Sequence, residues 1–152
     1  MLATASEVLV SSTNSATGLA GVELFQGLSA ADLERIERVA HQRSYEPGAV
    51  IVEEGQGGIA FFVLTSGQAV VTRTGKDGQE HELRKIGPGG VFGEMALFTD
   101  RRRTATVKAI EPTVCLALHK LEFREELRRN PEVSMRLLDT LAARLSEAYD
   151  LL

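Results

Sequence analysis

Apolar residues in the segment from Ser29 to Gln42 recur at intervals of three, which is the spacing of one face of a helix. They are Leu33, Ile36 and Val39. Ser29 and Asp32 open the segment in the spacing of a capping box, where each side chain accepts a hydrogen bond from the other residue's backbone amide. The pattern therefore predicts an amphipathic helix over 29–42.

From Ser44 to His119 the apolar residues form short runs that are separated by glycines. Runs of this kind, bounded by turn residues, are typical of strands. They lie at Val50–Val52, Phe61–Thr65, Ala69–Thr74, Glu82–Ile86, Thr104–Val107 and Val114–Leu118. The tripeptide Lys76-Asp77-Gly78 predicts a hairpin tip, because glycine adopts a positive φ easily. We therefore expect an antiparallel sandwich or barrel in this region.

The helical spacing returns after Lys120. It predicts one helix from Leu121 to Arg129 and a second that begins at Pro131, since proline suits the first turn of a helix. Apolar residues of the second helix alternate in steps of three and four, which is the spacing of a coiled-coil seam. They are Leu138, Leu141, Leu145, Ala148 and Leu152. This stripe fits docking on the protein's own sheet and pairing in a homodimer equally well.

The length of 152 residues fits one domain with a single core. Residues 1–20 are rich in Ser, Thr and Ala, and we expect them to form a flexible N-terminal tail. The domain is predicted to span 21–152. Its parts are an N-terminal helical part at 21–43, a β-roll at 44–119 and C-terminal helices at 120–152.

Composition places the chain among globular proteins. It is 43% hydrophobic and 25% charged, with a formal net charge of −4, which suits neither a disordered segment nor an electrostatic partner for DNA. The single cysteine, Cys115, lies in an apolar run and predicts a buried thiol in a reducing compartment. No secretion signal or membrane span is visible, so we expect a cytoplasmic protein with no membrane partner.

The segment from Gly87 to Val107 contains the candidate chemistry. Glu94–Leu97 is a good helix-forming tetrapeptide that is too short for a structural helix, and a helix N-terminus suits an anion. Arg103 can make a forked contact to phosphate oxygens, Glu94 can accept from a ribose hydroxyl, and Gly93 lets a sugar approach the backbone. The glycines here lack the lysine of a P-loop and the third glycine of a dinucleotide fingerprint.

The sequences Phe92-Gly-Glu-Met-Ala-Leu97 and Arg102-Arg-Thr-Ala-Thr-Val107 resemble the phosphate-binding cassette of cyclic nucleotide-binding domains. This family includes protein kinase A regulatory subunits, cyclic-nucleotide-gated channels and the bacterial catabolite activator. The resemblance implies that Glu94 binds the ribose 2′-hydroxyl. It also implies that Arg103, nine positions later, binds the cyclic phosphate.

The same resemblance implies a mainly β fold, an antiparallel, jelly-roll-like β-roll with flanking helices, whose C-terminal helix closes as a lid over the base. The backbone at Met95 and Ala96 would help to bind the phosphate. The base would rest on the roll, and Arg144, thirteen residues past the proline, would reach it from the lid. The remaining contacts implied for the base are Val71, Leu83, Ile86 and Thr104, the last of which could also lie near the phosphate.

The function implied is a regulatory domain that senses a cyclic nucleotide. Thr104 is compatible with both bases, and the bacterial relatives favour cAMP over cGMP. We expect no cofactor besides this ligand, an effector protein of unknown identity, and no nucleic-acid partner, since the activator's DNA-binding segment would begin after the last residue given.

Two alternatives come from other classes. A small phosphodiesterase or a cupin-like β-roll enzyme would need metal ligands, but His41, His81 and His119 are scattered and form no metal-ligand spacing. We therefore expect no enzyme and no metal. The second alternative is a structural or dimerisation module without a ligand.

Overall fold

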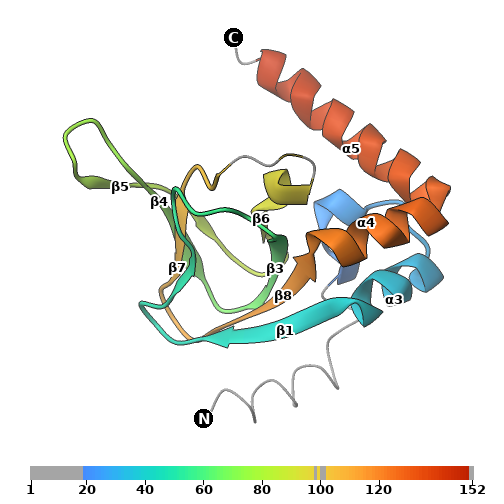
Figure 1. Ribbon diagram of the computed structural model, residues 1–152, viewed down its shortest axis with the longest axis horizontal. Helices are drawn as coiled ribbons and strands as arrows, with labels where there is room; N and C mark the ends of the chain where they lie inside the picture. The colour runs from blue at the N-terminus through green and yellow to red at the C-terminus, as the bar shows by residue number, and fades with distance from the viewer. Residues whose placement is uncertain (1–18, 98, 100–101, 151–152) are drawn as a thin grey trace.

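Two four-stranded antiparallel sheets form the centre of the structure, a computed structural model that describes residues 19–97, 99 and 102–150 (Figure 1). The strand order is β1-β8-β3-β6 in one sheet and β2-β7-β4-β5 in the other. The strands are β1 (Ala40–Tyr45), β2 (Val50–Val52), β3 (Ala60–Ser66), β4 (Ala69–Thr74), β5 (Glu80–Ile86), β6 (Val91–Phe92), β7 (Thr106–Ala109) and β8 (Thr113–His119). The predicted β-roll is confirmed.

Helical elements flank the first sheet. They are η1 (Glu23–Phe25), α3 (Ala30–Arg38), α4 (Lys120–Arg129) and α5 (Pro131–Asp150). A further short 3-10 helix, η2 (Glu94–Leu97), stands within the roll. The predicted capping box is present, because Ser29 and Asp32 accept hydrogen bonds from each other's backbone amides. Among the described helices, none combines the length and the apolar character that crossing a membrane requires.

Strands β3 and β8 are buried on both faces, which explains their unbroken apolar sequences. Alternate side chains point to opposite faces of a strand. Phe61 and Leu118 face the helices and join Phe25 and Phe123 in one core. Phe62 and Cys115 face the other sheet and fill the interior of the roll. Cys115 is buried, as the sequence predicts.

The first long helix is shorter than its sequence pattern predicts. It ends at Arg38, and residues 40–45 form β1 instead of completing the helix. Strand β1 is largely polar and pairs along its full length with β8, from Ala40 opposite Leu118 to Tyr45 opposite Thr113. Pairing with a buried neighbour strand here overrides local propensity, so the sheet begins within the segment predicted as helical.

Leu19, which the prediction placed in the tail, is fully buried in the core beside Val22 and Phe25. The three residues are spaced three apart, and the amides of Val22 and Phe25 donate to the carbonyl oxygens of the residues three positions earlier. Residues 1–18, with the rest of the predicted tail, lie outside the described residues.

Strand β7 starts two residues later than its sequence pattern predicts. The chain before it pairs with a loop, because the Arg103 amide donates to the Gln56 carbonyl oxygen and the Gly55 amide donates to the Arg103 carbonyl oxygen, each at 2.8 Å. Thr104 lies in a bend after this pairing. Arg103 is thus held between the loop and the strand.

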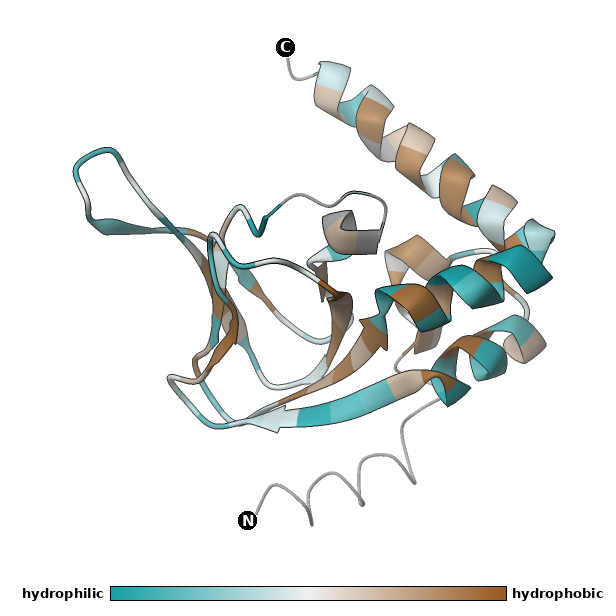
Figure 2. Ribbon diagram, viewed as in Figure 1, coloured by the Kyte–Doolittle hydropathy of each residue, from teal (hydrophilic) through white to brown (hydrophobic). Residues whose placement is uncertain are grey.

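Helix α5 packs against η1 and α4 near its start and then extends beyond them (Figure 1). The apolar stripe of α5 is only partly buried by the rest of the protein. Leu141 packs against the core, whereas Leu138 and Leu145 are 57% and 56% exposed. Brown bands along α5 in Figure 2 contrast with the teal, hydrophilic hairpin of β4 and β5. Leu152 lies outside the described residues.

Candidate functional site

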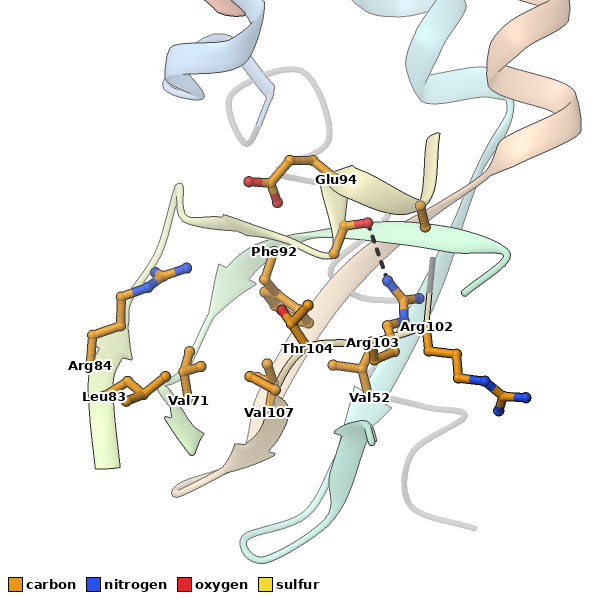
Figure 3. A pocket seen from close by; sticks show the side chains of 13 residues that line it. Val52, Val71, Leu83, Arg84, Phe92, Glu94, Arg102, Arg103, Thr104 and Val107 are labelled. Atoms are coloured by element: carbon orange, nitrogen blue, oxygen red, sulfur yellow. Dashed lines mark hydrogen bonds between the residues drawn. The ribbon is translucent and has the colours of Figure 1, made fainter. Parts of the chain in front are cut away.

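A cavity of about 280 Å³ lies between the inner face of the roll and η2 (Figure 3). Strands β2, β4, β5 and β7 form its apolar side, while η2 and the segment before β7 form its polar side. Its lining residues are Val52, Val71, Leu83, Arg84, Phe92, Gly93, Glu94, Ala96, Arg102, Arg103, Thr104, Ala105 and Val107. The structure therefore brings most of the predicted site residues together.

Arg103 is fixed by two backbone carbonyl groups. Its Nη1 donates to the Gly93 oxygen at 3.2 Å, and its Nη2 donates to the Ala60 oxygen at 2.6 Å. Burial lowers the pKa of Arg103, and the charge of Glu94 acts in the opposite direction. A guanidinium stays protonated in proteins, so the cavity contains a half-buried positive charge whose position is set by the backbone.

Two glycines leave the space that this guanidinium occupies. Gly93 has φ +78°, a left-handed conformation that other residues rarely adopt, and a Cβ there would lie 2.5 Å from Nη1 of Arg103. A Cβ at Gly58 would lie 2.8 Å from Cζ of Arg103 and 2.9 Å from Cβ of Ala96. The sequence contains no signal for a role of Gly58 at the site, because the nearness of Gly58 to Arg103 depends on the loop pairing.

Glu94 and Ala96, which both belong to the turn η2, line the cavity. Ala96 is buried, and its amide donates to the Gly93 carbonyl oxygen at 3.1 Å, so this amide already has a partner within the turn. This pairing differs from the expectation that the Ala96 amide serves a ligand. The side chain of Met95 lies outside the described part of the structure.

Three of the four residues of the roll predicted to contact a base line the cavity. Val71 is buried, while Leu83 and Thr104 are exposed, and all three line the cavity. Ile86 does not line it, since this side chain is buried in the cluster between the sheets. Ile86 supports the roll from within, and its contact with a base stays a prediction.

Helix α5 is not part of the cavity, because none of its described side chains is among the lining residues. The side chain of Arg144, the residue predicted to reach the base from this helix, lies outside the described structure. The role of Arg144 stays a prediction.

Several lining residues have no counterpart in the predicted site. Arg102 is exposed, and its Nη1 donates to the Gly55 carbonyl oxygen at 2.9 Å. Arg84 lies on β5, next to Leu83. The alternation of inward side chains could have indicated Val52 and Val107, whereas the sequence holds no comparable signal for Arg84. Within the described residues, no three His, Cys, Asp or Glu side chains gather in a group that could hold a metal ion.

Comparison with known proteins gives relatives among receptor proteins and protein kinases. The chain is 37% identical over 128 residues to the cyclic AMP receptor protein of Thermus thermophilus, a match that covers 84% of this chain and 59% of the relative. It is 39% identical over 100 residues to a cGMP-dependent protein kinase of Eimeria tenella, covering 66% of this chain and 10% of the kinase. The chain thus spans less than two thirds of the length of these relatives.

Solved structures with the same fold include the N-terminal domain of a transcriptional regulator from Streptomyces coelicolor, at TM-score 0.81 and 30% identity, covering 88% of this chain and 94% of that one. The catabolite activator protein of Thermus thermophilus matches at TM-score 0.76 and 37% identity, covering 85% of this chain and 60% of that one. Because these relatives include a transcriptional regulator, the prediction of no nucleic-acid partner is unsupported.

The family model that matches is described as the cyclic nucleotide-binding domain, and it matches residues 42–130. This range includes β2 to β8, most of β1, the turn η2 and the arginine that the carbonyl groups fix. The chain belongs to the family of cyclic nucleotide-binding domains.

Proposed function

We propose that the protein binds a 3′,5′-cyclic nucleotide in the cavity beside η2 and does so without changing it chemically. The observation that supports this most strongly is the position of Arg103. Two carbonyl groups hold its half-buried guanidinium at the cavity wall, on the same side as Glu94. A fixed, partly desolvated cation suits a singly charged phosphodiester ring.

Other residues of the cavity match the sugar and the base of the ligand. Glu94 accepts a hydrogen bond from the ribose 2′-hydroxyl, and Gly93 lets the sugar lie close to the backbone. The base rests on Val71 and Leu83, near Thr104. Charge-assisted hydrogen bonds contribute about 1.5–3 kcal/mol each, so two or three of them with base burial give about micromolar affinity.

The signal passes from η2 to the C-terminal helices. The backbone amide of Lys120, at the start of α4, donates to the Ile59 carbonyl oxygen at 2.7 Å, and its Nζ donates to the Thr99 carbonyl oxygen at 3.5 Å. Helix α4 also packs against η2, so a ligand that draws η2 inward shifts the start of α4. Helix α5 then closes toward the cavity as a lid, with Arg144 approaching the base.

The exposed part of α5 supports a homodimer. Leu138, Leu145 and Tyr149 are each more than half exposed, and a second copy of α5 would cover them. A homodimer of this kind, or a separate effector protein, would receive the conformational change. A cytoplasmic location fits the single buried cysteine.

Calorimetric titration of the purified protein with cAMP, cGMP and 5′-AMP tests this function. We expect binding of at least one cyclic nucleotide and much weaker binding of 5′-AMP. Absence of binding by both cyclic nucleotides would instead favour the structural module. Incubation with each cyclic nucleotide followed by chromatography separates the binding domain from an enzyme, which would produce a 5′-monophosphate.

A further inference from the structure

A second cavity, of about 440 Å³, adjoins the first at Val52 and Arg103, which line both. Its other lining residues belong to β1, β2, β3 and β8 and to the loop between β2 and β3. Binding sites for small molecules are commonly cavities of about 300–1,000 Å³. The second cavity is thus large enough for a ligand of its own.

The guanidinium of Arg103 forms part of the wall between the two cavities. Its Nη1 donates to the carbonyl oxygen of Gly93, which lines the first cavity only (Figure 3). Its Nη2 donates to the carbonyl oxygen of Ala60, which lines the second cavity only. A charge that binds beside Arg103 in either cavity therefore acts on a cation that both cavities share.

The charges of the second cavity favour an anion. The acidic and basic residues other than histidine that line it are Arg43, Arg103 and Glu53, so positive charge exceeds negative. Arg43 is exposed, and no described residue forms a hydrogen bond or an ion pair with it, which leaves its N–H donors available for a ligand. Burial raises the pKa of Tyr45 to about 12 against the opposing charge of Arg43, so this residue adds a protonated hydroxyl at neutral pH.

The same cavity also offers apolar surface. Val50 and Ile59 line it and are 44% and 69% exposed, and an apolar group that covers them gains free energy by leaving water. We propose that the second cavity binds a small organic anion that opposes binding of the cyclic nucleotide. The carboxylate of this anion meets Arg43 and Arg103. Its apolar rings cover Val50 and Ile59.

The opposition follows from the shared cation. A carboxylate in the second cavity and a cyclic phosphate in the first would both draw on the charge of Arg103, and two anions so close together repel each other. Each ligand therefore weakens the other by the same factor. This coupling rests on the proposed function, whereas binding of the anion in the second cavity does not.

Calorimetric titration with 2-naphthoate, in the absence of any nucleotide, tests the second cavity. The neutral 2-naphthamide lacks the charge and acetate lacks the rings, so both should bind at least about tenfold more weakly than 2-naphthoate. Arg43→Ala should weaken 2-naphthoate by at least about tenfold, and Glu53→Gln should strengthen it by removing a like charge. Arg73→Ala, exposed on β4 and outside both cavities, should leave the affinity unchanged. Absence of 2-naphthoate binding, or equal affinity in Arg43→Ala, would overturn the proposal.

Titration with a cyclic nucleotide at rising concentrations of 2-naphthoate tests the coupling. The affinity for the nucleotide should fall by about fivefold or more and then level off, because both ligands can bind at once. In Arg43→Ala the nucleotide should bind normally, and the same concentrations of 2-naphthoate should have much less effect. An affinity that keeps falling in proportion to 2-naphthoate would place the anion in the first cavity and overturn the proposal, as would an affinity that does not change. The titration without nucleotide decides on the second cavity even if the proposed function fails.

Discussion

The guanidinium of Arg103 donates to the carbonyl oxygen of Gly93, the residue just before η2, at 3.2 Å. This hydrogen bond joins the two parts of the cassette, which are ten positions apart in the sequence. The positive φ of Gly93 and the absence of a side chain there allow the approach. The protein's own backbone thus holds the cation and the turn in position relative to each other.

Substitution of the loop residue Gly58 should be as damaging as a substitution within the cassette. Gly58→Ala places a methyl group against Arg103 and Ala96, which should weaken nucleotide binding and lower the free energy of unfolding by about 1–3 kcal/mol. Gly57→Ala is the matched control, since a Cβ there meets nothing within 4 Å. Calorimetry and denaturant unfolding measure both effects. Equal behaviour of the two variants would contradict the close packing around Arg103.

The role of Glu94 can be separated from general effects by changing the ligand. Glu94→Ala removes the proposed acceptor of the ribose 2′-hydroxyl, and affinity for a cyclic nucleotide should fall by about tenfold or more, because the lost hydrogen bond is to a charged group. For the 2′-deoxy ligand the same substitution should cost little. The measurement is titration of both proteins with both ligands. Similar losses for the two ligands would place Glu94 away from the sugar.

The buried thiol should make stability depend on alkaline pH. Burial raises the pKa of Cys115 from 9.0 to about 12, so the unfolded chain releases its proton at lower pH than the folded protein does. The stabilisation is complete below pH 9 and is lost as the pH rises toward 12, by about 1 kcal/mol between pH 9 and 10. Burial likewise raises the pKa of Tyr45 to about 12, and this residue contributes at still higher pH.

Comparison with Cys115→Ala isolates this contribution, because the other titrating groups remain. Urea unfolding at pH 8, 9 and 10 should show a steeper decline for the unmodified protein than for the variant. Parallel declines would mean that the thiol ionises as readily in the folded protein as in the unfolded chain.

The proposed dimer depends on the exposed leucines of α5. Leu145→Glu places a charge in the proposed interface and should convert a dimer to a monomer in analytical ultracentrifugation. Leu121, which is 80% exposed on α4, is the control: Leu121→Glu should leave the assembly intact. A protein that is monomeric at high concentration, with and without a cyclic nucleotide, would rule out this interface.

Sequence patterns predicted those parts of the structure that depend on local preferences. The hairpin tip at Gly78, the turn Glu94–Leu97 and the helix start at Pro131 all lie where turn and cap residues indicate. The sequence pattern did not predict strand β1, because its polar residues form a strand only by pairing with β8. Local propensity contains no information about that partner.

The same reasoning applies to the site. The resemblance of residues 92–107 to a phosphate-binding cassette identified the end of the cavity that is built from one continuous segment. The other end depends on the register of β4 against β5, where Arg84 pairs with Val71 and Leu83 is an extra residue. The same register leaves Ile86 inside the roll. A bulge of this kind is visible only once the strands are paired.

Titration of a cyclic nucleotide into the unmodified protein and into Arg103→Ala tests the central claim most directly. Affinity should fall by at least about tenfold, because the substitution deletes the charge-assisted contacts to the phosphate. Arg103→Lys should also bind weakly, since an ammonium lacks the planar fork, and Arg73→Ala, exposed on β4 outside the cavity, should bind normally. Unchanged affinity in a folded Arg103→Ala protein would contradict the account.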